Sequence, residues 1–161
     1  NILVENLAKE FGEQCLVGSV DVIKTSDSGY VVVTESGDSR LSESAADSLS
    51  ALVRQPIGEI YLNSIDQDGT GQGYDLSILT LLPKICPIPI ILAGGIGNAK
   101  HLAVGFLDDR VDAVATANLF NFVGDGLQRA REVLVNDGFS LAIWPPLNDL
   151  LFSTKSDTLQ S

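Results

Sequence analysis

The sequence predicts an α/β fold that forms half of a (βα)8 TIM barrel, with four parallel βα units behind a leading helix. Strand-like and helix-like segments alternate along 161 residues, and the strand-like segments are continuous apolar runs that end in polar, glycine-rich loops. Apolar runs without alternation are typical of strands that are buried on both faces of a parallel sheet. A full barrel takes about 250 residues, so a chain of this length holds roughly half of one.

Helical spacing of apolar side chains marks the helices, and runs rich in Ile, Val and Leu mark the strands. Glycines supply the stops, at Gly12 after the first helix and at Gly138 after the last. In chain order the predicted elements are a helix over residues 2–11, a strand over 15–21, a β-hairpin with arms at 22–25 and 30–34, a helix over 42–53 with Ser42 or Ser44 as its cap, a strand beginning near Gly58, a helix capped by Asp75 and ending near Leu82, a strand over 88–92, a helix over 99–107, a strand over 111–117 and a helix over about 126–135.

The half barrel is therefore predicted to occupy residues 1–138, and residues 139–161 are expected to form an irregular C-terminal tail. The sequence begins at Asn1 and contains no methionine. We interpret this as a piece of a longer protein, although a processed N-terminus would look the same.

The net charge and the hydropathy of the chain limit the kinds of partner that it can bind. The formal net charge is −11 at pH 7, which argues against a nucleic-acid surface because such surfaces are basic. An acidic chain can still hold an anionic small molecule, since backbone N–H groups bind phosphate whatever the net charge. No apolar run reaches the ~20 residues of a membrane helix, and we expect a cytoplasmic protein.

The sequence gives little support to metal or cofactor chemistry. Cys15 and Cys86 are the two cysteines and His101 is the single histidine, so no cluster has metal-ligand spacing. Both cysteines lie in apolar stretches, which favours buried, reduced thiols over a disulfide. His101 is predicted to be a surface residue. We expect no metal and no cofactor.

The stretch from residue 63 to residue 75 is the candidate site, because loops at the carboxyl ends of parallel strands carry the chemistry of α/β proteins. Asp66, Asp68 and Thr70 recur at a period of two, so an extended chain puts them on one face. The glycines between them allow the backbone to approach a ligand closely. The alternative is an ordinary solvated turn, since Asp and Gly are common turn residues.

Four motifs in this order carry a resemblance to a known family. They are Ser19-Val20-Asp21, the string from Ser64-Ile65-Asp66-Gln67-Asp68-Gly69-Thr70 to Gly73-Tyr74-Asp75, the pair Gly94-Gly95 after a strand, and residues 113–122. Over residues 3–138 the chain resembles the C-terminal half of the cyclase subunit of imidazole glycerol phosphate synthase, a (βα)8 barrel. The resemblance implies a lyase of histidine biosynthesis that uses ammonia from a glutaminase partner to form imidazole glycerol phosphate and aminoimidazole carboxamide ribotide.

The resemblance also implies roles for single residues. Asp21 stands where the family has a general acid or base, and the alternative for Asp21 is a loop-bridging or capping aspartate. Asp66 is interpreted as structural, and Glu59 is either the ammonia gate at the opposite pole or an ordinary solvent-facing glutamate. The implied substrate contacts are Asn63, Asp68 and Thr70, and the implied phosphate cradle is Gly94, Gly95, Ala117 and Asn118.

The chain departs from the family pattern at Ala93 and Asn118, where serines are usual, so a hydroxyl contact to phosphate would be lost. Asn63 and residues 115–122 look closer to relatives that work with an amidotransferase in making amidino sugars for surface polysaccharide. The family's other catalytic aspartate belongs to the N-terminal half, so an inactive phosphate-binding fragment is a third reading. A half barrel also exposes sheet edges, and we expect either self-association or pairing with the missing half.

Overall fold

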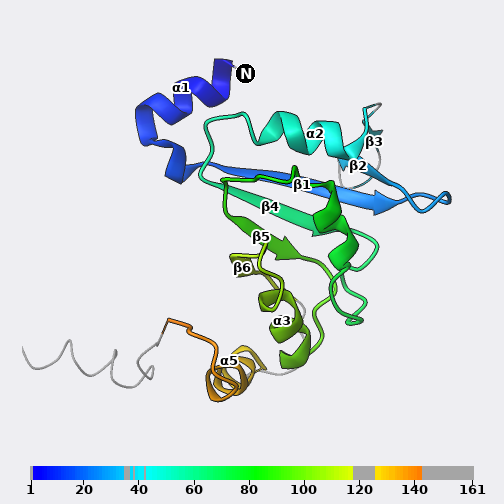
Figure 1. The fold of residues 1–161 in the computed structure, drawn as a ribbon, viewed down its shortest axis with the longest axis vertical. Coiled ribbons are helices and arrows are strands. Elements are labelled where there is room, and N and C mark those ends of the chain that lie inside the picture. The colour runs from blue at the N-terminus through cyan, green and yellow to red at the C-terminus, as the bar shows by residue number, and fades with distance from the viewer. Residues whose placement is uncertain (1, 35–36, 38, 42, 118–125, 143–161) are drawn as a thin grey trace, which may run out of the picture.

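The computed structural model describes residues 2–34, 37, 39–41, 43–117 and 126–142, and within them it contains one mixed six-stranded sheet. The strands lie in the order β3-β2-β1-β4-β5-β6 (Figure 1). Their bounds are β1 Val17–Lys24, β2 Tyr30–Thr34, β3 Ser39–Arg40, β4 Glu59–Ser64, β5 Ile90–Ala93 and β6 Ala113–Val114. Strands β1, β4, β5 and β6 run parallel to one another, and β2 and β3 pair antiparallel at one edge.

Along the chain, helices and strands alternate, as the sequence predicts. The bounds of the helices are α1 Ile2–Phe11, the 3₁₀ turn η1 Glu13–Cys15, α2 Ala45–Leu52, the 3₁₀ helix η3 Leu76–Leu81, α3 Ala99–Phe106 and α5 Gly126–Asn136. Ser44 caps α2 by accepting a hydrogen bond from the backbone N–H of Asp47, and Asp75 caps η3 in the same way through the N–H of Ser77.

Three elements differ from the sequence prediction. The strand that begins at Val17 continues to Lys24 and so absorbs the first arm of the predicted hairpin, which then extends beyond the sheet (Figure 1). The segment after Asp75 is a 3₁₀ helix, and it ends where Leu82, the residue before Pro83, takes an extended conformation. The last predicted strand shortens to Ala113–Val114.

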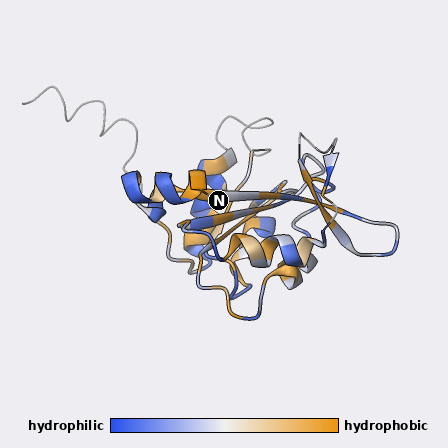
Figure 2. Cartoon of the chain, turned by 90° about the horizontal axis from the view of Figure 1, so that it is seen from above, coloured by the Kyte–Doolittle hydropathy of each residue, from blue (hydrophilic) through white to orange (hydrophobic). Residues whose placement is uncertain are grey.

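The main core lies on one face of the sheet. Ile60 and Leu62 of β4 are fully buried and pack with Leu49 of α2 and Ile78 of η3. Figure 2, a view at right angles to Figure 1, shows that the helices next to the sheet have both hydrophobic and hydrophilic segments, as amphipathic helices require.

The opposite face of the sheet is open, which corrects the prediction that the strands are buried on both faces. Exposure alternates along β1 and β4, and on β1 Val17 is 52 % exposed and Ser19 is also exposed. The apolar runs are suited to two covered faces, but no element among the described residues covers this one. In a barrel this face is the interior.

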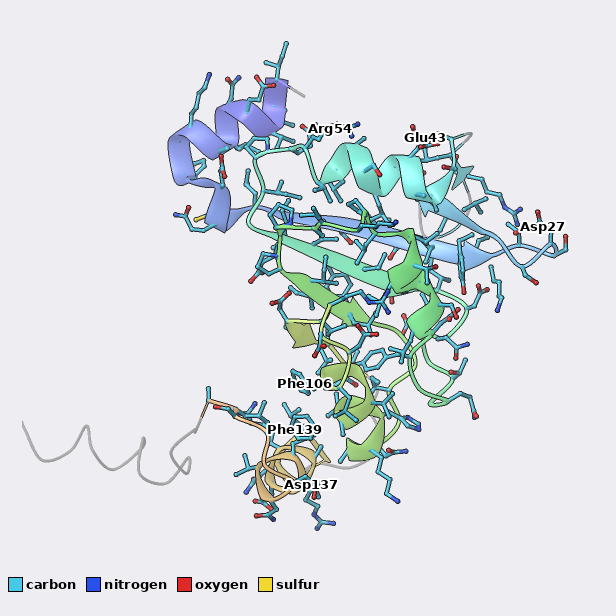
Figure 3. The ribbon with its side chains drawn as sticks, in the orientation of Figure 1. Asp27, Glu43, Arg54, Phe106, Asp137 and Phe139 are labelled. Carbon is cyan, nitrogen blue, oxygen red and sulfur yellow. The ribbon has the colours of Figure 1, made fainter. Side chains whose placement is uncertain are left out.

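A second apolar cluster joins α3 to α5. Leu102 and Leu134 are buried there, and the rings of Phe106 and Phe139 lie 5.8 Å apart between centroids (Figure 3). The predicted stop is present, since Gly138 has φ 92° and the N–H of Phe139 returns to the carbonyl of Leu134. Phe139, in the predicted tail, therefore packs against these helices, and residues 143–161 lie outside the described residues.

Two remaining predictions concern cysteines and membrane helices. Cys15 and Cys86 are both free thiols, but Cys15 is exposed because it lies in the η1 turn and not in a strand. Within the described ranges, no helix has the length and hydropathy needed to cross a bilayer.

Candidate active site

The site is built where the parallel strands end. Asp21 of β1 and Asn63 of β4 are register partners, and Ala93 of β5 is the next partner in the same row. The amide Nδ2 of Asn63 donates a hydrogen bond of 3.0 Å to Oδ1 of Asp21. Adjacent parallel strands thus bring a carboxylate and a carboxamide from distant parts of the chain into direct contact.

The loop after β4 folds back over these strand ends. The N–H of Asp68 donates to the carbonyl of Ser64 at 3.1 Å, which turns the chain and brings the Asp68 carboxylate over the sheet. Asp66 accepts a hydrogen bond from the N–H of Lys24 at 2.5 Å, so it ties the loop to β1 in the structural role predicted for it.

Thr70 does not point into the site. Its hydroxyl donates to the carbonyl of Gln67 at 2.7 Å and accepts from the N–H of Gln72 at 3.2 Å. The predicted substrate contact is therefore engaged inside its own loop. The period-two pattern does not put Thr70 on one face with Asp66 and Asp68, because the loop turns at Ser64 and does not continue as an extended chain.

Glycines allow the loops after β4 and β5 to touch. Gly95 has φ 98°, and a Cβ at this position would lie 2.1 Å from the carbonyl oxygen of Gly73. The N–H of Gly73 in turn donates to the carbonyl of Gly95 at 2.7 Å. His101, which was predicted to be a surface residue, is half-buried against this contact, and its Nδ1 accepts from the N–H of Gly97 at 3.3 Å.

A small pocket of about 70 Å³ lies between the three loops at this end of the sheet. It is lined by Tyr61, Asn63, Asp68, Gly94, Gly95, Ile96, Ala115, Thr116 and Ala117. Five of the predicted site residues therefore meet in one place, and Asp21 adjoins them through Asn63. Asn118 lies outside the described residues.

Sequence reasoning missed Tyr61. The signal that could have found it is the strand period, because Tyr61 precedes Asn63 by two residues and so shares its face of β4. Burial raises the pKa of the Tyr61 phenol, and the negative charges of Asp68 and Asp21 raise it further. Tyr61 thus adds a protonated donor to a pocket that also holds the Asp68 carboxylate, the side chains of Asn63 and Thr116, and backbone amides.

Glu59 is exposed at the other end of β4, five residues before Ser64, so the length of the strand separates it from the pocket. This is the opposite pole of the sheet, where the prediction put it. Among the described residues, no group of three or more His, Cys, Asp and Glu side chains could hold a metal ion.

The arrangement can hold an anion next to a hydroxylated carbon chain. In the described part of the chain the amides of Gly94 and Gly95 donate to no backbone carbonyl, so both donors are available to a ligand. The Asp68 carboxylate accepts hydrogen bonds from hydroxyl or amine groups. Fold and pocket together indicate an α/β protein of the (βα)-barrel kind, with a pocket at the carboxyl ends of the parallel strands.

The chain belongs to the family described as histidine biosynthesis protein, whose model matches residues 1–124. The family is a TIM barrel, and the four parallel strands with their helices are part of that barrel. The resemblance that the motifs indicated is therefore confirmed.

Curated relatives agree with this assignment. A protein of Parasynechococcus marenigrum, named provisionally as imidazole glycerol phosphate synthase subunit hisF2, is 40% identical over 151 residues, which is 93% of this chain and 56% of that protein. The imidazole glycerol phosphate synthase subunit HisF of Chlorobaculum tepidum is 36% identical over 141 residues, covering 88% of this chain and 56% of the relative. The chain thus spans about half the length of the relatives it matches.

Proposed function

We propose that this chain provides half of a cyclase that, with ammonia from a glutaminase subunit, forms imidazole glycerol phosphate and aminoimidazole carboxamide ribotide. The observation that carries the proposal is the convergence of Asp21, Asn63, Asp68 and the Gly94-Gly95 loop at one end of the parallel sheet. Relatives named HisF at 34% to 36% identity support the choice of reaction.

Asp21 is the proposed general acid or base. A carboxylate at a strand end can take a proton from an attacking nitrogen and return it to a leaving group. The hydrogen bond from Asn63 holds one carboxylate oxygen and leaves the other available. Asp68 is the proposed contact for substrate hydroxyls. Thr70 would take part only if its loop rearranged, because its hydroxyl is already engaged with Gln67 and Gln72.

The substrate phosphate is assigned to the backbone amides of Gly94, Gly95 and Ala117, with Asn118 as the next member of the cradle. Converging N–H groups bind phosphate without any basic side chain, which suits a chain of net charge −11. Ala93 and Asn118 supply no hydroxyl where the family usually has serines, so at these two positions the phosphate would be held by the backbone.

Two macromolecular partners belong to this proposal. A glutaminase would dock at the pole where Glu59 is exposed, with Glu59 gating the entry of ammonia into the barrel. The missing half barrel would cover the open face of the sheet and supply the second catalytic aspartate. A cytoplasmic location goes with these partners and with the two free cysteines, because free thiols are usual in reducing compartments.

A second candidate is the cyclase-like subunit that works with an amidotransferase in amidino-sugar synthesis. The observation that favours it is Asn63, whose carboxamide binds Asp21 and lines the pocket. In this case a different phosphoester would occupy the same amides. An inactive phosphate-binding half barrel is the third reading.

Asp21→Asn tests the cyclase proposal. The chain would be combined with the N-terminal half of a HisF relative and assayed for ammonia-dependent turnover of the ribulosyl aminoimidazole-carboxamide substrate. We expect Asp21→Asn to lower kcat about 100-fold or more, as loss of an acid–base group does. Asp27→Asn, in the turn between β1 and β2, is the matched control and should leave kcat unchanged. Phosphate binding without turnover in the unaltered pair would contradict the cyclase proposal and favour the third reading.

A further inference from the structure

We propose that Tyr61 is a ligand-contacting residue, whose phenol O–H donates a hydrogen bond to a sugar oxygen of a phosphorylated ligand in the pocket. This inference rests on the proposed function, because it names a further contact in the same site. It adds a donor from strand β4 to the donors and acceptors that the loops provide.

The position of Tyr61 follows from strand geometry. Tyr61 and Asn63 share one face of β4, and the register partner of Tyr61 on β5 is Ile91. That face is the open one, so Tyr61 is not enclosed by a helix, and its side chain is half-buried. It lines the pocket together with Asn63 and Asp68.

The phenol has no competing partner. Within the described part of the chain, no hydrogen bond joins the Tyr61 hydroxyl to another residue. The two other tyrosines differ in this respect, since Tyr30 donates to Asp75 at 2.6 Å and Tyr74 donates to the carbonyl of Ala115 at 3.4 Å. A phenol that lines a polar pocket without a partner is available to a ligand, because buried tyrosine hydroxyls usually find one.

The surroundings keep this phenol protonated. Burial raises the pKa of Tyr61, and the nearby Asp68 and Asp21 carboxylates oppose a further negative charge. At neutral pH Tyr61 is therefore a neutral donor. It can meet a hydroxyl or carbonyl oxygen without repelling an anionic ligand.

The class of ligand follows from the three kinds of group around the pocket. The amides of Gly94 and Gly95 suit a phosphate, the Asp68 carboxylate suits a hydroxyl donor, and Tyr61 suits an oxygen acceptor. A polyhydroxylated sugar phosphate offers all three. Inorganic phosphate carries no sugar oxygen, so at the Gly94 and Gly95 amides it should bind without using Tyr61.

Tyr61→Phe separates these contributions, because it removes the hydroxyl and keeps the ring. Calorimetric titration of the full chain with ribose 5-phosphate and with inorganic phosphate gives the two dissociation constants. We expect Tyr61→Phe to raise the Kd for ribose 5-phosphate about fivefold, the size of one neutral hydrogen bond, and to leave the Kd for inorganic phosphate unchanged. Tyr30→Phe is the matched control, since it removes a phenol outside the pocket and should change neither value.

The outcomes distinguish the two proposals. Ribose 5-phosphate binding that Tyr61→Phe does not alter overturns the role of Tyr61 and leaves the proposed function standing. Failure of the unaltered chain to bind either ligand overturns both. A second measurement covers a variant that does not fold: with ring-labelled tyrosine in the unaltered chain, the Tyr61 NMR signal should shift when ribose 5-phosphate is added. If the Tyr61 signal does not move while the Gly94 and Gly95 amides do, the proposal is wrong.

Discussion

At the scale of single residues, the candidate site depends on close backbone approach. The N–H of Gly73 donates a hydrogen bond to the carbonyl of Gly95 across two loops, and this contact leaves no space for a side chain at Gly95. The sequence could identify Gly95 as part of a phosphate loop. It could not reveal that Gly95 also packs against Gly73, because that contact depends on how the loop after β4 folds back.

Gly95→Ala tests this packing, with Gly69→Ala as its matched control. Both glycines have positive φ, 98° and 76°, so each substitution carries a backbone penalty of about 1–3 kcal/mol. Nothing lies within 4 Å of a Cβ at Gly69, whereas a Cβ at Gly95 meets the carbonyl of Gly73 at 2.1 Å. We expect urea unfolding to show a larger loss of free energy for Gly95→Ala. Equal losses would mean that the loop moves aside at no cost.

At the scale of elements, the sequence predicts the order and the type of the helices and strands better than it predicts their lengths. Apolar periodicity identified the helix over residues 2–11 with its observed bounds, and it put the start of the next central strand near Gly58, next to the observed start at Glu59. The helix after Asp75 was predicted with its cap and its end, but its 3₁₀ type was not specified, and Tyr61 was not recognised as a site residue. The strand period places Tyr61 on the same face as Asn63, but only the folding of the loop after β4 over that face makes it part of a pocket.

The hairpin formed by β1 and β2 is tied to η3 by Tyr30, which donates to the Asp75 cap at 2.6 Å. Burial and the hydrogen bond to Asp75 raise the pKa of Tyr30 from 10.0 to about 12. Because the folded pKa lies above the unfolded value, the stabilising contribution is complete below pH 10 and is lost as the pH rises toward 12.

Tyr30→Phe should therefore lower the free energy of unfolding at pH 8 by about 1 kcal/mol, the usual contribution of a hydrogen bond. Above pH 12 the difference between the two proteins should vanish, since the unaltered Tyr30 is then ionised. Chemical unfolding at a series of pH values measures this. A difference that stays constant across the series would show that the bond to Asp75 does not set the pKa of Tyr30.

At the scale of the whole molecule, the open sheet face is the main consequence of a chain that spans half of its relatives' length. Val17 is 52 % exposed on this face, and Tyr61 and Ile91 are half-buried in the next row. Apolar side chains that a sheet leaves uncovered on one face favour association. The complementary half barrel would do so in a full enzyme, and a second copy can do so for the chain alone.

Val17→Lys tests which surface drives this association. We expect light scattering after size-exclusion chromatography to give the unaltered chain a mass above its monomer mass of 17.1 kDa, and Val17→Lys to shift the population toward monomer. Leu107→Lys is the control, because Leu107 is 73 % exposed but lies just after α3, away from the open face. Salt should favour the associated form, since screening weakens the repulsion between two chains that each carry a net charge of −11. A stable monomer at micromolar concentration would contradict self-association, and the missing half barrel would then be the sole occupant proposed for this face.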